Sequence, residues 1–403
     1  MAHEVQEPIG LRLQWSVYLS GGFASSISGQ MHVILPLWLV MLHPSPLVWG
    51  IALASRTFLP FLFAIPFGAL MDKVGARRVI LCSSFVLVGS VALFPTGTLI
   101  PWLIVINMIA GLAATLSWIG AQTLVGQRMQ GDPTYTGRLS LVTRIGELIG
   151  PPVAGYLWDV LGPYAAFGFI TLWAVGGVVG ALMLPKTDDE RTGAMPSVVA
   201  SDLVPRLSHY MGAFYMMAIP AVLLVVMVSI LRQAGQGMQS TFYIVYLIQE
   251  GYSGTAIGTL LAIFPLVGAL VTPTVGPLAK RVNNAWLAIA MVGGSIVMVA
   301  ATPLLGSYTI LMAAIAFRGS MVGLMQPLMI SMIAQAAAAG DQGKGVGLRA
   351  TANRLAVTFT PIIMGGVIEF VGLENGFYVV GSVLLILLMG VAIYVKSAPG
   401  FRT

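Results

Sequence analysis

Residues 137–167 of this chain read GRLSLVTRIGELIGPPVAGYLWDVLGPYAAF, and residues 347–377, 210 positions later, read GLRATANRLAVTFTPIIMGGVIEFVGLENGF. Both stretches are long and apolar enough to cross a membrane as a helix. They also share unusual residue types at the same places, which predicts that the chain consists of two similar halves. The matched pairs are Gly137 and Gly347, Arg144 and Arg354, Pro151 and Pro361, Gly155 and Gly365, Asp159 and Glu369, Gly162 and Gly372, and Phe167 and Phe377.

The composition is typical of a protein that lies almost entirely within a membrane. Of 403 residues 57% are hydrophobic and only 8% charged, whereas soluble domains carry about 25% charged residues. Twelve apolar runs predict an all-α polytopic membrane protein made of two pseudo-symmetric six-helix bundles. The expected spans are 14–42, 47–71, 78–97, 101–127, 139–160, 164–184, 220–249, 254–279, 285–303, 308–337, 346–371 and 375–395.

The positive charges give the orientation. The odd-numbered joints between spans contain no Lys or Arg, whereas the even-numbered joints and the termini hold fifteen of the 20. This alternation predicts that both termini are cytoplasmic, in a plasma (inner) membrane. It also explains the sequence pI of about 9.5 without nucleic-acid binding. The lone Cys82 excludes an internal disulfide.

The long joint 185–219 divides the chain into an N-terminal half, 1–184, and a C-terminal half, 220–403. Repeated halves in a membrane protein typically build a solute site near the midplane between them, and rocking about that site gives alternating access. No nucleotide-binding loop is present in the sequence, which argues against ATP as the driving force. We expect a monomer without enzymatic activity, cofactor or metal.

The joint after the second span reads Gly68-Ala-Leu-Met-Asp72-Lys73-Val-Gly75-Ala-Arg77-Arg78. It resembles the loop signature G-x-x-x-D-[RK]-x-G-x-[RK]-[RK] of the major facilitator superfamily. A shift of 208 positions carries Gly50 onto Gly258 and this joint onto a degenerate copy at Lys280-Arg281. The resemblance covers the whole chain and implies a twelve-span transporter, in which this loop governs conformational change.

The fifth span contains a second motif, Gly146-Glu147-Leu-Ile-Gly150-Pro151-Pro152-Val-Ala154-Gly155. It resembles the G-x-x-x-G-P-x-x-G-G signature of the superfamily's antiporters, with Ala154 in place of a glycine, and points to export. Two features of its proton-coupled exporters are missing. Asn107 stands where many have an arginine in the fourth span, and the first span has no acidic residue.

Five arginines lie inside apolar runs, where each costs about 2.5–3.5 kcal/mol. Arg56, Arg232 and Arg318 lie ten to twelve residues from the span ends, roughly 15–18 Å deep, and we expect them to bind solute. Arg144 and Arg354 lie nearer the cytoplasmic ends. For these two we favour gating or structural roles, including a local pair between Arg144 and Glu147.

Polar stripes in the first and seventh spans correspond under the 208 shift. Ser25, Ser28 and His32 fall on Gln233, Gln236 and Ser240, as expected if both stripes line one cavity or hydrogen-bond between helices. Glu147, the only carboxylate in the interior of a span, is the first candidate for proton coupling. His32 is the second, because an imidazole titrates near neutral pH. A structural pair or a packing histidine remains an alternative for each.

With five interior arginines against one glutamate, the sequence favours a small anionic or strongly polar solute. The function expected is secondary active transport by alternating access, as proton-coupled efflux. An importer or exchanger of an organic or inorganic anion is the main alternative, and a lipid flippase or a non-transporting sensor the lesser ones. Expected partners are the solute, protons and membrane lipid.

Overall fold

The computed structural model describes residues 9–129, 133–186, 215–336 and 342–398. Within these ranges the side chains of 64–70, 72, 73, 133, 215, 216, 330, 333–336 and 342–347 are not described. Three residues of the loop signature, Gly68, Asp72 and Lys73, are therefore placed only by their backbone, at the end of a helix.

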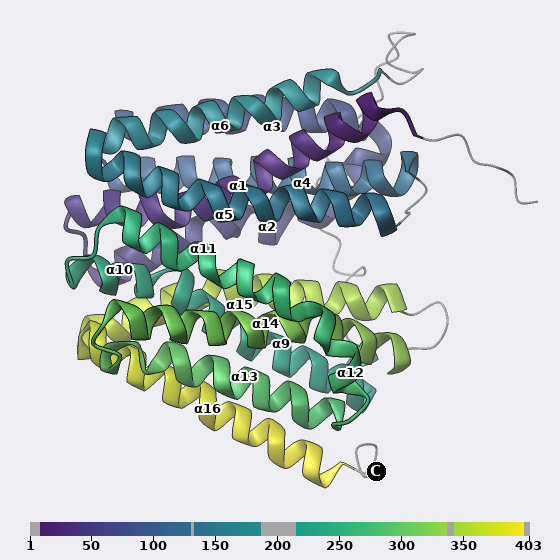
Figure 1. Cartoon of the computed structure of the whole chain (residues 1–403), viewed down its shortest axis with the longest axis vertical. Coiled ribbons are helices and arrows are strands. Elements are labelled where there is room, and N and C mark those ends of the chain that lie inside the picture. The colour runs from purple at the N-terminus through teal and green to yellow at the C-terminus, as the bar shows by residue number, and fades with distance from the viewer. Residues whose placement is uncertain (1–8, 130–132, 187–214, 337–341, 399–403) are drawn as a thin grey trace, which may run out of the picture.

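The described chain consists of helices and their connections (Figure 1). The N-terminal half contains α1 (Leu11–Met41), α2 (Pro46–Val74), α3 (Ala76–Leu93), η1 (Phe94–Thr96), α4 (Ile100–Arg128), α5 (Pro133–Leu161) and α6 (Pro163–Met183). The C-terminal half contains η3 (Tyr215–Ala218), α9 (Pro220–Ser240), α10 (Phe242–Gln249), α11 (Gly254–Val271), η4 (Thr272–Thr274), α12 (Val275–Ala279), α13 (Asn284–Ala300), η5 (Thr302–Leu304), α14 (Tyr308–Ala336), α15 (Gln342–Val371) and α16 (Leu373–Ser397).

The predicted fold class is confirmed, and each predicted span matches a helical segment. Ten segments of the described chain are long and apolar enough to cross a membrane. The other two are α13, which has only 17 residues, and α5, whose polar residues lower its hydropathy. The seventh span is broken at Thr241, where φ is −127° and ψ is −91°, so α9 and α10 are separate helices.

Sharp turns join neighbouring helices at glycines in the left-handed region. Gly75 between α2 and α3 has φ of 91°, and the repeat-related Gly162 and Gly372 have φ of 84° and 83°. A side chain is strained at such angles, which explains why glycine recurs at both copies of the α5–α6 and α15–α16 turn.

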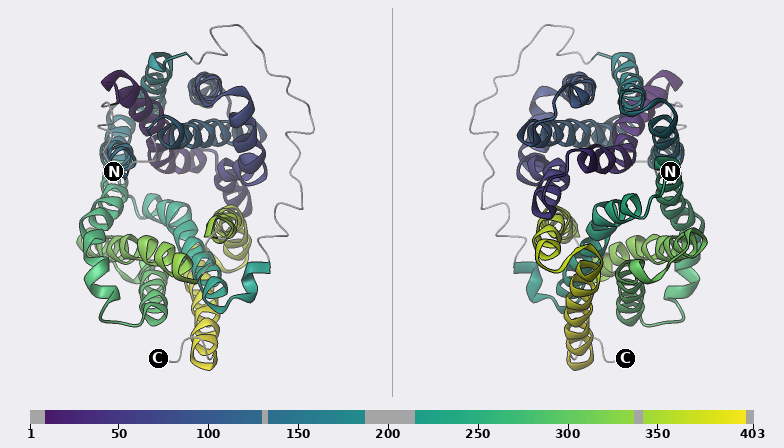
Figure 2. Two further views of the ribbon diagram at one scale, coloured as in Figure 1. Left: turned by 90° about the vertical axis from the view of Figure 1, so that its right-hand side faces the viewer. Right: turned by 90° about the vertical axis from the view of Figure 1, so that its left-hand side faces the viewer.

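The two halves form separate bundles that meet along two helix pairs, α2 with α15 and α5 with α11 (Figure 2). We call the end of the bundle where α1 begins and α16 ends the terminal end, and the opposite end the distal end. The halves touch closely at the distal end, and a cavity separates them toward the terminal end. The boundaries of the predicted linker, 185–219, stay a prediction, because residues 187–214 lie outside the residues that the structure describes.

A cavity between the two halves and its closed distal end

The cavity has a volume of about 530 Å³ and is lined by both halves. It extends from the middle of the helices toward the terminal end. The lining residues of the N-terminal half are Ser25, Trp118, Ser140, Thr143, Arg144 and Glu147, and those of the C-terminal half are Phe264, Pro265, Gly268, Thr272, Gly319, Val322, Gly323, Gln326 and Pro327.

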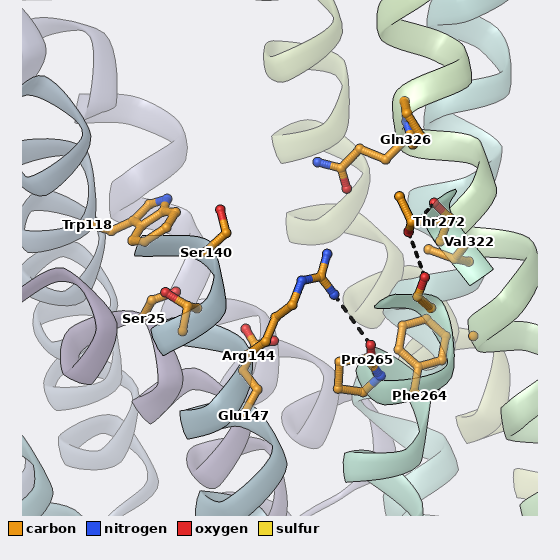
Figure 3. A pocket seen from close by; sticks show the side chains of 15 residues that line it. Ser25, Trp118, Ser140, Arg144, Glu147, Phe264, Pro265, Thr272, Val322 and Gln326 are labelled. Carbon is orange, nitrogen blue, oxygen red and sulfur yellow. Dashed lines mark hydrogen bonds between the residues drawn. The ribbon is translucent and has the colours of Figure 1, made fainter. Parts of the chain in front are cut away.

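Arg144 and Glu147 are the charged residues of this lining. Arg144 reaches across the cavity and donates a hydrogen bond from Nη1 to the carbonyl oxygen of Pro265, 3.4 Å away (Figure 3). The expected local pair is not formed: no ion pair joins Arg144 to Glu147 in this structure. Glu147 is half-buried, and no described residue forms a hydrogen bond with it. Its carboxylate therefore remains available to the contents of the cavity.

The rest of the lining combines aromatic rings with hydrogen-bonding groups. Trp118 lies on the side of the N-terminal half and Phe264 on the opposite side (Figure 3). Thr272 uses its hydroxyl within the protein, donating to the carbonyls of Gly268 at 2.7 Å and Gly323 at 3.1 Å. Gln326 projects from α14 toward the cavity (Figure 3). The lining therefore offers aromatic surface together with polar groups of either charge.

At the distal end, glycines allow the halves to approach to backbone contact. Gly50 of α2 lies against the backbone of Pro361 in α15, and Gly258 of α11 lies against Pro151 in α5. A methyl group at either glycine would overlap the opposing backbone. Gly155 likewise packs on Gly254. The repeat-related glycines and prolines of the sequence thus form one pseudo-symmetric contact, in which each half supplies both partners.

Two carboxylates cross this contact to the first turn of a helix in the other half. Asp159 accepts hydrogen bonds from the backbone N–H of Gly254 and of Thr255, both at 2.8 Å, and from the Thr255 hydroxyl at 2.6 Å. The repeat-related Glu369 accepts one bond, from the backbone N–H of Leu47 at 3.0 Å. Negative charge is favourable at a helix N-terminus, so both carboxylates stabilise the closed distal end.

Arg354 makes the counterpart of the Arg144 contact. Its Nη1 donates to the carbonyl oxygen of Pro60 in α2 at 2.6 Å, and Thr358 one turn further along donates to Thr57 at 3.0 Å. Both repeat-related arginines thus bond a proline carbonyl of the other half, which agrees with the gating role we favour for them. That role itself stays a prediction.

Arg318 lies outside the cavity lining and is enclosed by acceptors. Its Nε donates to the carbonyl and hydroxyl oxygens of Ser295 at 3.1 and 3.0 Å, one Nη to the side-chain oxygen of Gln239, and the other to the carbonyl of Gly235 at 2.9 Å. The guanidinium also lies over the ring of Phe264, 5.5 Å from its centroid. Arg318 therefore joins α13, α14 and α9, and supports one aromatic wall of the cavity.

The other two deep arginines have fewer partners. Arg56 donates to Ser28 at 3.3 Å, but its other terminal nitrogen, Nη1, is buried without a hydrogen-bond partner. His32 is close enough to Arg56 to interact with its charge electrostatically. Arg232 is 8% exposed and its Nε has no acceptor.

None of the predicted solute-binding residues lines the cavity in this conformation, so solute binding by them stays a prediction. The set comprises Arg56, Arg232, Arg318, Gln233, Gln236, Ser28 and His32. The oxygen of the Gln236 side chain is also buried without a partner.

The glycine-proline motif forms the contact between α5 and α1. Gly146 packs on Ser26 and Gly150 on Gln30, whose buried amide has no hydrogen-bond partner at either polar atom. In the loop signature, Arg77 donates to the carbonyl of Leu184 at 2.8 Å and so ties α3 to the end of α6. The described residues contain no group of three or more potential metal ligands.

Sequence reasoning overlooked most of the cavity lining and the two carboxylate contacts. Asp159 and Glu369 are matched as repeat partners, and that match could have suggested a shared role. Trp118, Phe264 and Gln326 resemble ordinary membrane-helix residues, and their position in the cavity depends on the packing of two halves.

Comparison with known proteins agrees with this architecture. The model of the Major Facilitator Superfamily matches residues 17–230 and again residues 225–401. An uncharacterized MFS-type transporter of Schizosaccharomyces pombe is 33% identical over 107 residues, which span 26% of this chain and 24% of that protein.

Solved structures resemble the whole fold. The nucleoside transporter NupG has a TM-score of 0.73 at 13% identity, covering 96% of this chain and 100% of that chain. A bacterial homolog of the human lysosomal transporter Spinster, inward-facing and occupied, has a TM-score of 0.74 at 13% identity, covering 99% of both chains.

Proposed function

Because the chain belongs to the major facilitator superfamily and is a multi-pass membrane transporter rather than an enzyme, we propose that it moves a small, strongly polar organic solute by alternating access. The cavity between the halves is the solute site, open toward the terminal end. With the charge pattern of the loops, that end is cytoplasmic, in a plasma (inner) membrane, and the protein acts as a monomer.

The observation that carries this proposal is the composition of the cavity. Arg144 and Glu147 offer one positive and one negative group within a turn of α5, and Trp118 and Phe264 line the same cavity. Such a lining suits a solute that carries charged or hydrogen-bonding groups on a ring or short carbon skeleton. The predicted excess of positive charge does not extend to this lining, so the polar description fits it better than a purely anionic one.

Glu147 also supports proton-coupled export. Its carboxylate faces the cavity, has no hydrogen-bond partner among the described residues, and lies on the helix whose glycine-proline motif packs against α1 and α11. Solute and proton can then compete for one group, so that protonation from one side releases solute on that side. His32, which interacts electrostatically with Arg56, is the second candidate for the proton site.

Thermal stabilisation by a library of polar organic solutes tests the proposal, because a ligand that binds the folded protein raises its Tm. Solutes that raise Tm should be exchanged across liposomes that contain the protein. Arg144→Gln and Glu147→Gln should weaken the stabilisation, and Glu250→Gln, which changes a carboxylate outside the cavity, should not. Unchanged stabilisation in both cavity variants would contradict the proposed site.

An anion importer or exchanger is the second candidate, favoured by two buried arginines whose Nε atoms find no acceptor among the described residues. Arg232 on α9 and Arg349 on the adjoining α15 are 8% and 9% exposed, and the Nε of each is buried without a hydrogen-bond partner. Buried cations without acceptors are costly, and an anion would compensate them. Exchange of a labelled organic anion would favour this candidate if the exchange rate does not depend on the pH gradient and exchange is lost in Arg232→Gln.

A further inference from the structure

Another large hollow lies on the outside of the N-terminal half, between α3 and α4. It has a volume of about 400 Å³ and reaches from Val74 and Arg78 at one end to Val86 and Ile109 at the other. It shares no lining residue with the solute cavity. Val86 and Ile109 are 40% and 38% exposed, so in a membrane this groove opens to lipid.

Apart from Arg78, the lining offers an apolar surface. The hydroxyl of Ser83 is turned into the bundle, where it donates to the carbonyl of Val79 at 2.7 Å and lies 2.8 Å from the hydroxyl of Ser117. The remaining surface comes mainly from aliphatic side chains of α3 and α4, such as Leu112 and Leu116. A groove of this kind accepts a hydrocarbon chain.

The charge is confined to one end of the groove. Arg78 lies in the first turn of α3, at the terminal end, where the positive end of the helix dipole also lies. Val86 follows eight residues later, so the apolar part extends about 12 Å from the arginine toward the middle of the membrane. Cation and hydrocarbon surface therefore occupy the depths of a lipid phosphate and of its acyl chain.

We propose that this groove binds one acyl chain of an anionic phospholipid, whose phosphate is held by Arg78. A guanidinium has five N–H donors and binds a phosphate through two of them, so Arg78 can hold the lipid in addition to its contacts within the protein. Basic pockets beside membrane helices bind anionic head groups in this way. The site is separate from the solute cavity and does not depend on the identity of the solute.

Cys82 provides a probe for this site, because it is the only cysteine of the chain, is exposed and lines the groove. In detergent solution, we would measure the rate at which an apolar maleimide modifies Cys82 while phosphatidylglycerol or phosphatidylcholine is added. Phosphatidylglycerol should slow the reaction several-fold and saturably, and phosphatidylcholine should do so much less. Equal slowing by both lipids, or none by either, would overturn the proposal.

Two sets of variants separate the site from general effects of lipid. Arg78→Gln should abolish the difference between the two lipids, and Arg78→Lys should keep part of it. In Cys82→Ser/Phe85→Cys, the thiol lies on the lipid-facing side of α3 outside the groove, and its labelling should not depend on the head group. A head-group difference that persists in Arg78→Gln or appears equally at position 85 would contradict the site.

Native mass spectrometry gives an independent measurement if Arg78→Gln does not fold. Val86→Trp fills the apolar end of the groove and leaves the arginine in place. It should retain clearly less phosphatidylglycerol than the wild-type protein under the same detergent exchange. Retention at the wild-type level would show that the acyl chain does not occupy this groove.

Discussion

The carboxylate of Asp159 should hold the distal end closed, and Asp159→Asn should loosen it. The substitution keeps the shape of the side chain but removes its charge and one of the two acceptor oxygens facing Gly254 and Thr255. A hydrogen bond to a charged group contributes about 1.5–3 kcal/mol. Both bonds to Thr255 are exposed, and water can replace them, so the lower end of this range applies.

A loss of about 1.5 kcal/mol from the closed distal state shifts its equilibrium with the open state about tenfold. Spin labels at Leu99→Cys and Leu304→Cys, in a Cys82→Ser background, report the change. Both positions are exposed, by 72% and 73%, at the distal end of opposite halves. In the distance distribution between the two spin labels, the ratio of the longer (open) to the shorter (closed) distance should be about ten times higher in Asp159→Asn than in the parent protein.

Glu369→Gln is the matched control, because Glu369 occupies the repeat-related place but accepts only one bond. Its effect on the distance distribution should be smaller, about two- to fivefold. A distribution unchanged by Asp159→Asn, or shifted more by Glu369→Gln than by Asp159→Asn, would refute the role we assign to these carboxylates.

Three further substitutions follow from the same geometry. Glu147→Gln should leave downhill exchange in liposomes largely intact at saturating solute but remove accumulation driven by a pH gradient. If accumulation is lost only in His32→Ala, the histidine is the carrier. Arg318→Gln removes the donor of a buried hydrogen-bond network and should lower the free energy of unfolding by about 3–5 kcal/mol, measured by thermal unfolding. Arg232→Gln should cause no such loss, because the Nε of Arg232 has no acceptor among the residues that the structure describes. Equal losses in the two variants would contradict this difference. Gly258→Ala places a methyl group against the backbone of Pro151 and should populate the open distal state in the same distance measurement; wild-type distances would show that the contact is not needed for closure.

The sequence alone was sufficient to predict the positions of the helices and the internal repeat. Gly162 and Gly372, matched by the 210 shift, both adopt the left-handed conformation that only glycine takes easily. Hydropathy alone would have missed α5, because Arg144 and Glu147 lower the hydropathy of this helix, yet the internal repeat marks the same segment. The break at Thr241 was not foreseen, because nothing in an apolar run of this composition distinguishes a broken helix from a continuous one.

The site was less predictable, because burial alone does not say which charges meet solute. Arg318 and Arg144 look alike in the sequence, as single arginines in apolar runs. The structure surrounds Arg318 with acceptors from α9 and α13, whereas Arg144 lines the cavity. That difference depends on which helix faces lie opposite each arginine in the packed bundle, which periodicity within one helix does not determine.

The claim that the cavity between the halves binds the transported solute is tested most directly by protection of Ser140→Cys in a Cys82→Ser background. Position 140 lines the cavity and is exposed, so a water-soluble maleimide should modify it readily. A solute that raises Tm and exchanges across liposomes should slow this modification several-fold, and Arg144→Gln should reduce the protection. A transported solute that leaves the rate unchanged at saturating concentration would contradict the claim.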